Sequence, residues 1–283
     1  MEIKARAKIN LSLDVLGKRK DGYHELRMVM QTVSLHDSVY LEKIPSGIEL
    51  VCTNGQIPQD DGNIAWKAAG LMTERYRLKS GVSIKIEKRI PVSAGLAGGS
   101  ADAAAVLRGM NLLLSLGLDN DSLRELGKRL GADVPYCIEG GTRLAEGTGE
   151  ILTALPDFSG VDIVLVKPRI DVSTAWVYGN FDTGKVGDSE RPDTELIRRV
   201  VGRRDLKAVA TAMRNVLEKV TVPEYPIVKE AKDRLLEEGA WGSMMSGSGP
   251  TVFGIFPDAA AAAEAFGRLS ADGRWQCFLT KTE

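Results

Sequence analysis

The sequence predicts an α+β fold because strand-like and helix-like segments occur in blocks, without the regular repetition of strand–helix–strand units. Residues 2–15 alternate between apolar and polar side chains almost without interruption, which is typical of a β-strand. Residues 161–167 form an apolar strand, after which the pattern becomes mostly helical from about Pro192. A chain of 283 residues is long enough for two domains. We expect a boundary near Leu155, between domains of residues 1–155 and 156–283.

The amino-terminal strands follow from period-two patterns. In the first strand Lys8 and Asn10 fall on the polar face, and alternation of this kind predicts that only the opposite face is buried. Gly17–Gly22 reads as a polar turn, and residues 27–43 read as further strand. Residues 82–86 alternate again and form a strand that leads into a glycine-rich loop.

Helices are expected where a capping residue is followed by apolar residues that recur at helical spacing. Asn63 is placed to cap a helix that runs to about Leu78, and the glycine-rich loop opens a long helix that ends near Leu116. Residues 121–130 form a short helix that a glycine stops. The segment 133–135 is expected to be a connector, because a proline disfavours helical backbone in the residue before it.

The carboxyl-terminal part is expected to be helical first and then mixed. The predicted helices lie near 193–201, 205–218 and 226–238, and strands follow near 250–256 and 275–281 with a helix between them.

Composition narrows the classes of function. The chain has 37 Lys and Arg against 38 Asp and Glu, so it lacks the basic excess of a broad nucleic-acid surface. Its three cysteines are widely separated and form neither a metal-binding spacing nor a disulfide framework. No apolar run reaches transmembrane length, and the first residues resemble neither a signal nor a transit peptide. We therefore expect a cytoplasmic protein with no membrane or nucleic-acid partner.

The most informative motif is the glycine-rich loop that begins at Pro91 and ends in a run of alanines. Gly95, Gly98 and Gly99 allow tight turns and close approach of the backbone to a ligand. Ser100 and Asp102 stand where a helix begins, the usual place for capping residues. Free N–H groups at such a start attract anions, so the loop is a candidate phosphate site. The alternative is close packing of a helix on a sheet, which also uses glycine and alanine.

Other short motifs carry chemistry only in combination. They are the Ala-Lys-Ile-Asn-Leu strand at 7–11, the Asp-Gly-Tyr-His turn at 21–24, Gly-Ala-Asp-Val-Pro at 131–135, and Ser-Gly-Ser-Gly-Pro at 246–250. Each has an ordinary structural reading as a solvated lysine, a capped turn, local hydrogen bonding or a tight entry into a strand. Their occurrence together in one chain is what carries a resemblance to a known family.

The two glycine loops and the early lysine strand resemble the three motifs of the galactokinase, homoserine kinase, mevalonate kinase and phosphomevalonate kinase superfamily. Within it, Asp-Gly-Tyr-His and Gly-Ala-Asp-Val-Pro are similar to the motifs of the 4-diphosphocytidyl-2-C-methyl-D-erythritol kinases. The resemblance covers almost the whole chain. It implies an N-terminal domain like ribosomal protein S5 domain 2 and a C-terminal ferredoxin-like domain.

The resemblance also implies an activity. It is ATP-dependent phosphorylation of the 2-hydroxyl of 4-diphosphocytidyl-2-C-methyl-D-erythritol, in the methylerythritol phosphate route to isoprenoids. The implied partners are ATP, Mg²⁺ and a small molecule that carries a cytidine diphosphate group, and the implied assembly is a monomer or a homodimer. Two rivals are a homoserine or mevalonate-type kinase and a non-catalytic nucleotide-binding sensor.

The resemblance assigns roles to particular residues. Lys8 and Asp133 match the catalytic pair. Asn10, Tyr23, His24 and Tyr178 match substrate contacts, with Trp176 as the rival of Tyr178 for stacking on cytosine. Ser100 is a candidate Mg²⁺ ligand, and Gly247, Ser248 and Gly249 form the second glycine loop. The residues assigned to ATP are Asn63, Pro91, Val92, Ser93, Ala94, Gly95, Leu96, Ala97, Gly98, Gly99, Ser100 and Ala101.

This chain departs from the family pattern at two places. Ala101 stands where the family often has a second serine, and the family can have glycine at the position of Ser93 or Ala97. Neither change removes a backbone donor, so the expected effect is on nucleotide affinity or metal contacts.

Overall fold

The computed structural model describes residues 1–283, which form two compact units. The first unit contains Met1–Ala7, His36–Pro91 and Ala97–Gly140, and the second contains Lys8–Leu35, Val92–Leu96 and Gly141–Glu283. The long strands β1 (Glu2–Lys18) and β2 (His24–Ile44) each contribute residues to both units. The predicted domain boundary near Leu155 remains a prediction.

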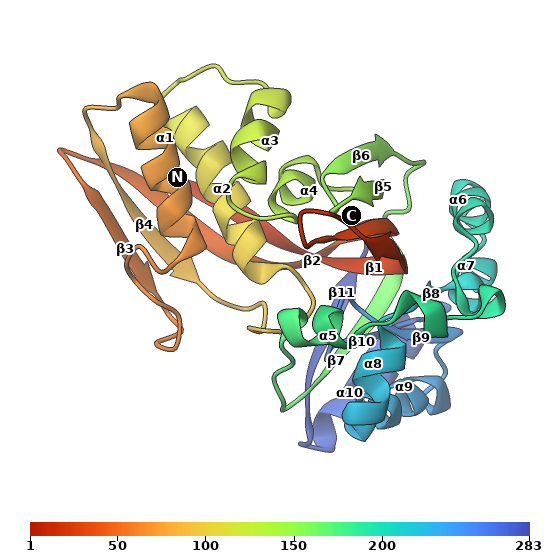
Figure 1. Ribbon diagram of the computed structural model, residues 1–283. Coiled ribbons are helices and arrows are strands. Elements are labelled where there is room, and N and C mark those ends of the chain that lie inside the picture. The colour runs from red at the N-terminus through yellow and green to blue at the C-terminus, as the bar shows by residue number, and fades with distance from the viewer. The chain divides into compact units, whose positions relative to one another are not determined.

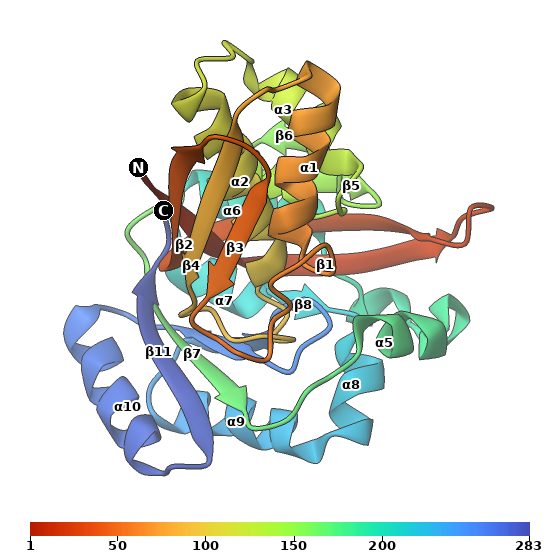
Figure 2. The ribbon, with the colours of Figure 1, turned by 90° about the vertical axis from the view of Figure 1, so that its left-hand side faces the viewer.

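The first unit contains part of a seven-stranded sheet, and helices cover this part. In its part of the sheet, β2 pairs with β4 (Gly81–Glu87) in antiparallel fashion, and β4 pairs with β3 (Ile48–Cys52) in parallel. The helices α1 (Ile64–Tyr76) and α2 (Gly98–Leu113) lie side by side over these strands, as Figures 1 and 2 show. The unit is completed by α3 (Asn120–Lys128) and α4 (Val134–Glu139).

The alanine run of α2 lets this helix pack closely on the sheet. Ala103, Ala104 and Ala105 are fully buried. A Cβ at Gly109 would lie 2.0 Å from Leu41 Cδ1 on β2, so a larger residue would require the Leu41 side chain to move. The close-packing reading of the glycine and alanine residues is therefore confirmed for the body of α2.

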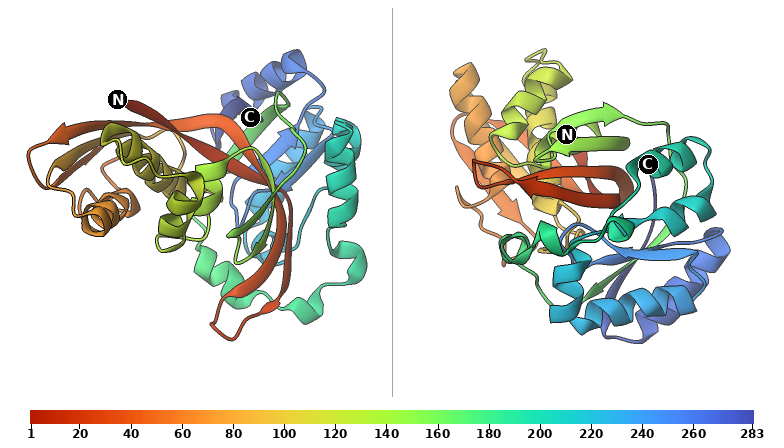
Figure 3. Two further views of the ribbon diagram at one scale, coloured as in Figure 1. Left: turned by 90° about the horizontal axis from the view of Figure 1, so that it is seen from above. Right: turned by 45° about the vertical axis from the view of Figure 1, so that its right-hand side comes forward.

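The second unit contains a four-stranded antiparallel sheet in the order β11-β7-β10-β9. Its strands are β7 (Asp162–Pro168), β9 (Gly242–Met245), β10 (Val252–Ile255) and β11 (Trp275–Lys281). The helices α9 (Pro226–Glu237) and α10 (Ala259–Ala271) pack against this sheet (Figures 2 and 3). Val164, Phe253 and Ile255 of these strands are fully buried and contribute to the core of the unit.

The rest of the second unit surrounds the hairpin formed by β1 and β2. The strand β5 (Thr142–Gly147) pairs with β2 and with β6 (Ile151–Ala154), and the short β8 (Arg214–Asn215) pairs in parallel with β1. The remaining helices are α5 (Thr174–Asn180), α6 (Thr194–Gly202), α7 (Leu206–Ala212) and α8 (Glu218–Glu224), with short 3-10 turns at Thr183–Lys185 and Asp188–Glu190.

Most predicted elements are confirmed, and two are wrong. The helix predicted over 205–218 ends at Ala212, because Arg214 and Asn215 instead form β8 on the edge of β1. The predicted connector at 133–135 is instead the start of α4, with the proline in the first turn, where its missing N–H has no intrahelical acceptor to lose. In both cases a local pattern was compatible with two structures.

Candidate functional site

Lys8 and Asn10 lie on β1 in the second unit, and both are buried, at 5% and 0% exposure. The expectation that their face of the strand is solvated is therefore wrong. The Lys8 ammonium donates a hydrogen bond to Asn10 Oδ1 at 2.9 Å, and the Asn10 amide donates to Met28 Sδ at 3.2 Å. The same Asn10 oxygen accepts the N–H of Gly247 at 3.1 Å. Asn10 thus holds Lys8 and the second glycine loop in one arrangement.

The two glycine loops meet within the second unit. Ser246 Oγ donates to the Gly95 carbonyl at 2.9 Å, and the Lys8 N–H donates to the Leu96 carbonyl at 3.1 Å. Gly95 has φ +72°, and a Cβ there would lie 2.1 Å from the Ser246 carbonyl oxygen. Glycine is therefore required at residue 95 both by the backbone conformation and by the closeness of the other loop.

Asn215 on β8 braces the second glycine loop. Its amide nitrogen donates to the carbonyls of Met245 and Gly247 at 2.9 and 2.8 Å, and its oxygen accepts the Leu217 N–H at 3.0 Å. Sequence reasoning missed this residue because it lay inside a predicted helix. The signal available was an asparagine, a poor helix former, within that helix.

The start of α2 in the first unit is unusual among the helices of this chain. Its N-cap is Ala97, which has φ +57° and makes no side-chain capping hydrogen bond. Side chains cap α1, α3, α5, α6, α7 and α10, whereas α4, α8 and α9 also lack a side-chain cap but have N-cap residues with negative φ. Ser100 and Asp102 lie inside α2, so the expectation that they cap it is wrong. The first N–H groups of α2 have no acceptor within the helix, as at every helix start.

Asn63 and Asp133 also belong to the first unit. Asn63 caps α1, as predicted, by accepting the Ala65 N–H at 2.9 Å, and its amide donates to the Pro58 carbonyl at 2.8 Å. Its assignment to ATP remains a prediction. Asp133 occupies the N-cap position of α4 without a side-chain capping bond. Because Lys8 belongs to the second unit, the catalytic pairing of these two residues remains a prediction.

The aromatic residues predicted to stack on cytosine have different ring partners within the second unit. The rings of His24 and Tyr178 lie 5.2 Å apart between centroids, whereas Trp176 packs edge-on against Tyr225 at 6.0 Å. Tyr23 is 65% exposed. Burial, and to a smaller degree the charge of Lys18, lowers the pKa of His24, which favours the neutral imidazole. A neutral imidazole offers both a donor and an acceptor.

The helix that carries Tyr178 is joined to the second glycine loop. Thr174 at the start of α5 shares a hydrogen bond of 2.8 Å between its hydroxyl and that of Ser248. The lysine strand, the second glycine loop and α5 therefore form one hydrogen-bonded cluster. The sequence motifs at 7–11 and 246–250, together with Tyr178, are brought together by the fold.

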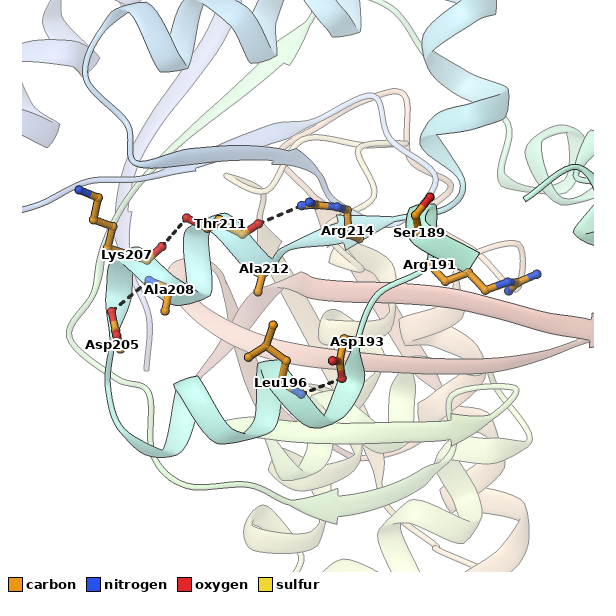
Figure 4. A pocket seen from close by; sticks show the side chains of 10 residues that line it. All are labelled: Ser189, Arg191, Asp193, Leu196, Asp205, Lys207, Ala208, Thr211, Ala212 and Arg214. Atoms are coloured by element: carbon orange, nitrogen blue, oxygen red, sulfur yellow. Dashed lines mark hydrogen bonds between the residues drawn. The ribbon is translucent and has the colours of Figure 1, made fainter. Parts of the chain in front are cut away.

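A cavity of about 600 Å³ elsewhere in the second unit includes none of the predicted site residues (Figure 4). Several of its polar side chains are already engaged within the protein. Asp193 and Asp205 cap α6 and α7, and the Arg191 guanidinium binds Asp14 at 2.6 Å. Arg214 donates to the carbonyls of Thr211 and Met213. The residues that line the cavity are Ser189, Arg191, Asp193, Leu196, Asp205, Lys207, Ala208, Thr211, Ala212 and Arg214.

Neither a metal centre nor a membrane segment is found. No group of three or more His, Cys, Asp or Glu side chains is placed so that it could hold a metal ion. None of the helices combines the length and the apolar character needed to span a bilayer.

Comparison with known proteins places this geometry in a family. The GHMP kinases N terminal domain matches residues 63–141, and the GHMP kinases C terminal domain matches residues 195–274. A 4-diphosphocytidyl-2-C-methyl-D-erythritol kinase of Acetivibrio thermocellus is 55% identical over 282 residues, which cover 100% of this chain and 99% of that protein. A crystal structure of 4-(cytidine 5'-diphospho)-2C-methyl-D-erythritol kinase has a TM-score of 0.86 at 34% identity, covering 100% of this chain and 99% of that one.

More distant structures share the fold alone. Homoserine kinase from Cytophaga hutchinsonii has a TM-score of 0.77 at 18% identity, with coverage of 100% of this chain and 94% of that chain. The fold and the match of both domains define the class: a GHMP kinase with the α+β architecture of that class, as predicted. Within the class the chain belongs to the 4-diphosphocytidyl-2-C-methyl-D-erythritol kinase family. It is accordingly an ATP-dependent phosphotransferase, which confirms the predicted enzyme class over that of a sensor.

Proposed function

We propose that the protein transfers the γ-phosphoryl group of ATP to the 2-hydroxyl of 4-diphosphocytidyl-2-C-methyl-D-erythritol. The products are the 2-phosphate and ADP, in the methylerythritol phosphate pathway of isoprenoid biosynthesis. The observation that carries this proposal is the His24–Tyr178 pair, which presents an aromatic face and a neutral imidazole in one place. Stacking on an aromatic ring and hydrogen bonding to the base edge are the means by which proteins hold a pyrimidine.

Lys8 and Asp133 are the proposed catalytic residues. Phosphoryl transfer requires alignment of the attacking hydroxyl and stabilisation of the charge that spreads over the phosphoryl oxygens. Asp133 would orient the hydroxyl and accept its proton late in the transfer, because an ordinary carboxylate is too weak a base to ionise an alcohol beforehand. Lys8, whose ammonium is held by Asn10, would orient the hydroxyl and stabilise the negative charge.

The proposed ATP site is the loop 91–101, whose helix start carries no side-chain cap. Backbone N–H groups and the helix dipole favour phosphate there. No acidic cluster offers a resident Mg²⁺ site, so we propose that Mg²⁺ enters with the nucleotide. Ser100 is the candidate protein ligand, and phosphate oxygens and water would complete the shell. The ion would offset charge on the β- and γ-phosphate oxygens.

Several finer assignments belong to the same proposal. The protein is proposed to act in the cytoplasm as a monomer or homodimer, on a small molecule and not on nucleic acid. The domains are proposed to divide near Leu155.

The deciding experiment is an ATP-consumption assay with four acceptors offered in parallel. We expect turnover with 4-diphosphocytidyl-2-C-methyl-D-erythritol and none with homoserine, mevalonate or galactose. Phosphorus NMR of the product should show a new phosphomonoester on the 2-oxygen. Turnover on homoserine or mevalonate in place of the first acceptor would overturn the proposal.

Two variants test the catalytic pair. Asp133→Asn should lower kcat by about a hundredfold or more while acceptor binding is kept. Lys8→Met should do the same, whereas Lys4→Met, which changes an exposed lysine on the same face of β1, should leave kcat unchanged. Near-normal turnover of Asp133→Asn would show that this carboxylate is not the proton acceptor.

A further inference from the structure

One arginine holds the turn that carries Tyr23 and His24. The turn joins β1 to β2 and lies at the free end of their hairpin (Figure 2). Arg19 Nε donates to Asp21 Oδ2 at 3.1 Å, and Arg19 Nη1 donates to Glu25 Oε2 at 2.8 Å. A single guanidinium therefore links a carboxylate inside the turn to a carboxylate near the start of β2. Arg19 is not among the predicted site residues.

Asp21 connects this guanidinium to the backbone of Tyr23. Its Oδ1 accepts the Tyr23 N–H at 3.1 Å, and the Tyr23 carbonyl accepts the Arg19 N–H at 2.8 Å. The Gly22 N–H donates to the Arg19 carbonyl at 3.2 Å, and the φ of +89° at Gly22 allows the chain to reverse there. The Tyr23 N–H, and to a smaller degree Arg19, lowers the pKa of Asp21, so the bridging carboxylate is charged at neutral pH. Both backbone groups of Tyr23 are thus fixed by this turn.

The position of the Tyr23 ring depends on the backbone that carries it. Tyr23 is 65% exposed, and its side chain makes no hydrogen bond or ring contact within the protein. His24 follows directly in the chain, and its ring lies against that of Tyr178. A ring without packing partners is held only as firmly as its backbone. The conformation of the turn therefore decides how the Tyr23 ring and the His24 imidazole are presented together.

We propose that Arg19 is a positioning residue for the pyrimidine end of the acceptor. Its two ion pairs hold the turn so that the Tyr23 ring and the His24 imidazole are arranged for the base before the acceptor binds. This inference rests on the proposed function, which supplies the acceptor. A turn that is ordered only on binding weakens the apparent affinity, because only the fraction of molecules with the turn in place can bind. Arg19 acts through the turn and not by contact with the acceptor.

The acids around Arg19 explain why a guanidinium suits this position. Burial raises the pKa of Glu150, but hydrogen bonds at Thr148 and Glu150 and the charge of Arg19 lower it overall, so Arg19 also acts on a third carboxylate. Without a cation here the acids would repel one another. The planar guanidinium presents several donors in fixed directions, whereas a lysine ammonium is a point charge without such a fork. Arg19→Lys should therefore keep the charge and lose the bridge.

The test is steady-state kinetics with saturating ATP and varied acceptor. Arg19→Met should raise the KM for 4-diphosphocytidyl-2-C-methyl-D-erythritol by about threefold to tenfold. Its kcat and its KM for ATP should stay within about twofold of the wild-type values, because the turn carries neither proposed catalytic residue. Arg19→Lys should give an acceptor KM between those of the wild type and Arg19→Met. An unchanged acceptor KM in Arg19→Met would overturn the inference.

Arg234 provides a matched control. Its guanidinium also binds two carboxylates, those of Glu237 at 2.7 Å and Glu238 at 2.9 Å, and its side chain is 35% exposed against 36% for Arg19. It lies on α9, which carries none of the proposed site residues. Both arginine-to-methionine variants should lower the Tm only slightly, because exposed ion pairs contribute little to stability. Only Arg19→Met should raise the acceptor KM, and an equal rise in Arg234→Met would contradict the positioning role.

A double-mutant comparison separates positioning from direct contact with the acceptor. Asp21→Asn combined with Glu25→Gln removes both charges that hold Arg19, and the asparagine keeps an oxygen for the Tyr23 N–H. This combination should reproduce the acceptor KM of Arg19→Met, and adding Arg19→Met to it should raise the KM no further. Effects that multiply would show that Arg19 binds the acceptor itself, and the inference would be wrong.

A measurement without acceptor keeps this inference separate from the proposed function. The heteronuclear NOE of the Tyr23 and His24 amides, recorded by NMR on isotope-labelled protein, should fall in Arg19→Met and keep its wild-type value in Arg234→Met. Loss of order in the turn, together with no acceptor turnover by the wild type, would reject the proposed function alone. Acceptor turnover by the wild type, with unchanged KM and NOE values in Arg19→Met, would reject the positioning role alone.

Discussion

Gly95→Ala tests the close approach of the two glycine loops. The new methyl group would be built 2.1 Å from the Ser246 carbonyl oxygen and 3.2 Å from the Gly249 nitrogen. Both are backbone atoms, so no side-chain rotation can relieve the overlap. One loop must move by about 1 Å to restore ordinary contact distances of roughly 3.4 Å or more.

The cost has two parts that a control variant separates. A φ of +72° costs an alanine about 1–2 kcal/mol, and forced displacement of packed backbone adds about 1–3 kcal/mol. Gly273 has φ +73° but no atom within 4 Å of its Cβ position. Gly273→Ala should therefore show the first part alone, and Gly95→Ala should lose about 2–5 kcal/mol in total.

Thermal unfolding measures the loss of stability, and steady-state kinetics measure the effect on the KM for ATP. For a chain of this size the loss at Gly95 corresponds to a Tm lower by about 5–20 °C. The KM for ATP should rise in Gly95→Ala and stay at the wild-type value in Gly273→Ala. If both variants lose the same stability and keep the same KM, the close approach of the loops does not constrain residue 95.

Three further outcomes follow from the same structure. Tyr178→Ala should abolish selectivity for a cytidine-containing acceptor in competition assays while Trp176→Ala keeps it; the reverse result would transfer the stacking role to Trp176. Asn215→Ala should lower the free energy of unfolding in urea by about 2–4 kcal/mol, because it strands two buried carbonyls and an N–H; a loss below about 0.5 kcal/mol would contradict this brace. Because folding raises the pKa of Asp102, its contribution to wild-type stability should decline between about pH 4 and pH 8. The slope should be at most about 1.4 kcal/mol per pH unit and should be absent in Asp102→Asn.

Local patterns predicted the elements well where one physical signal dominated. The alternation of residues 2–15, the Asn63 cap and the strands near 250–256 and 275–281 are confirmed, because periodicity and capping are properties of neighbouring residues. The same patterns failed where distant residues decide. Ser12 and Leu13 on β1 recruit β8 from within a predicted helix, and no signal within the residues of that helix specifies the pairing.

The sequence motifs of the candidate site were predicted, but the residues that hold those motifs in place were not. Lys8 and Asn10 read as a solvated face because polar side chains alternate with apolar ones. They are buried because Gly247 and Met28 bring partners for them from elsewhere in the chain. The buried ion-pair cluster of Lys88 with Asp37 and Asp102 was missed for the same reason, since the two acids are 51 and 14 residues from Lys88 and no short motif joins them.

The hydrogen-bonded cluster around the second glycine loop has a consequence for redesign of the acceptor. Gly247 is joined to Asn10, and Ser248 is joined to Thr174 on the helix that carries Tyr178. The Tyr178 ring itself contacts His24 and takes no part in holding that loop through any of these bonds. Changes of acceptor preference can therefore be sought at the aromatic rings one side chain at a time. Substitution of Thr174 or Ser248 would instead remove a hydrogen bond of the second glycine loop. Because this loop is also bonded to Asn10 on the lysine strand, such a change would disturb that strand as well as the helix that carries Tyr178.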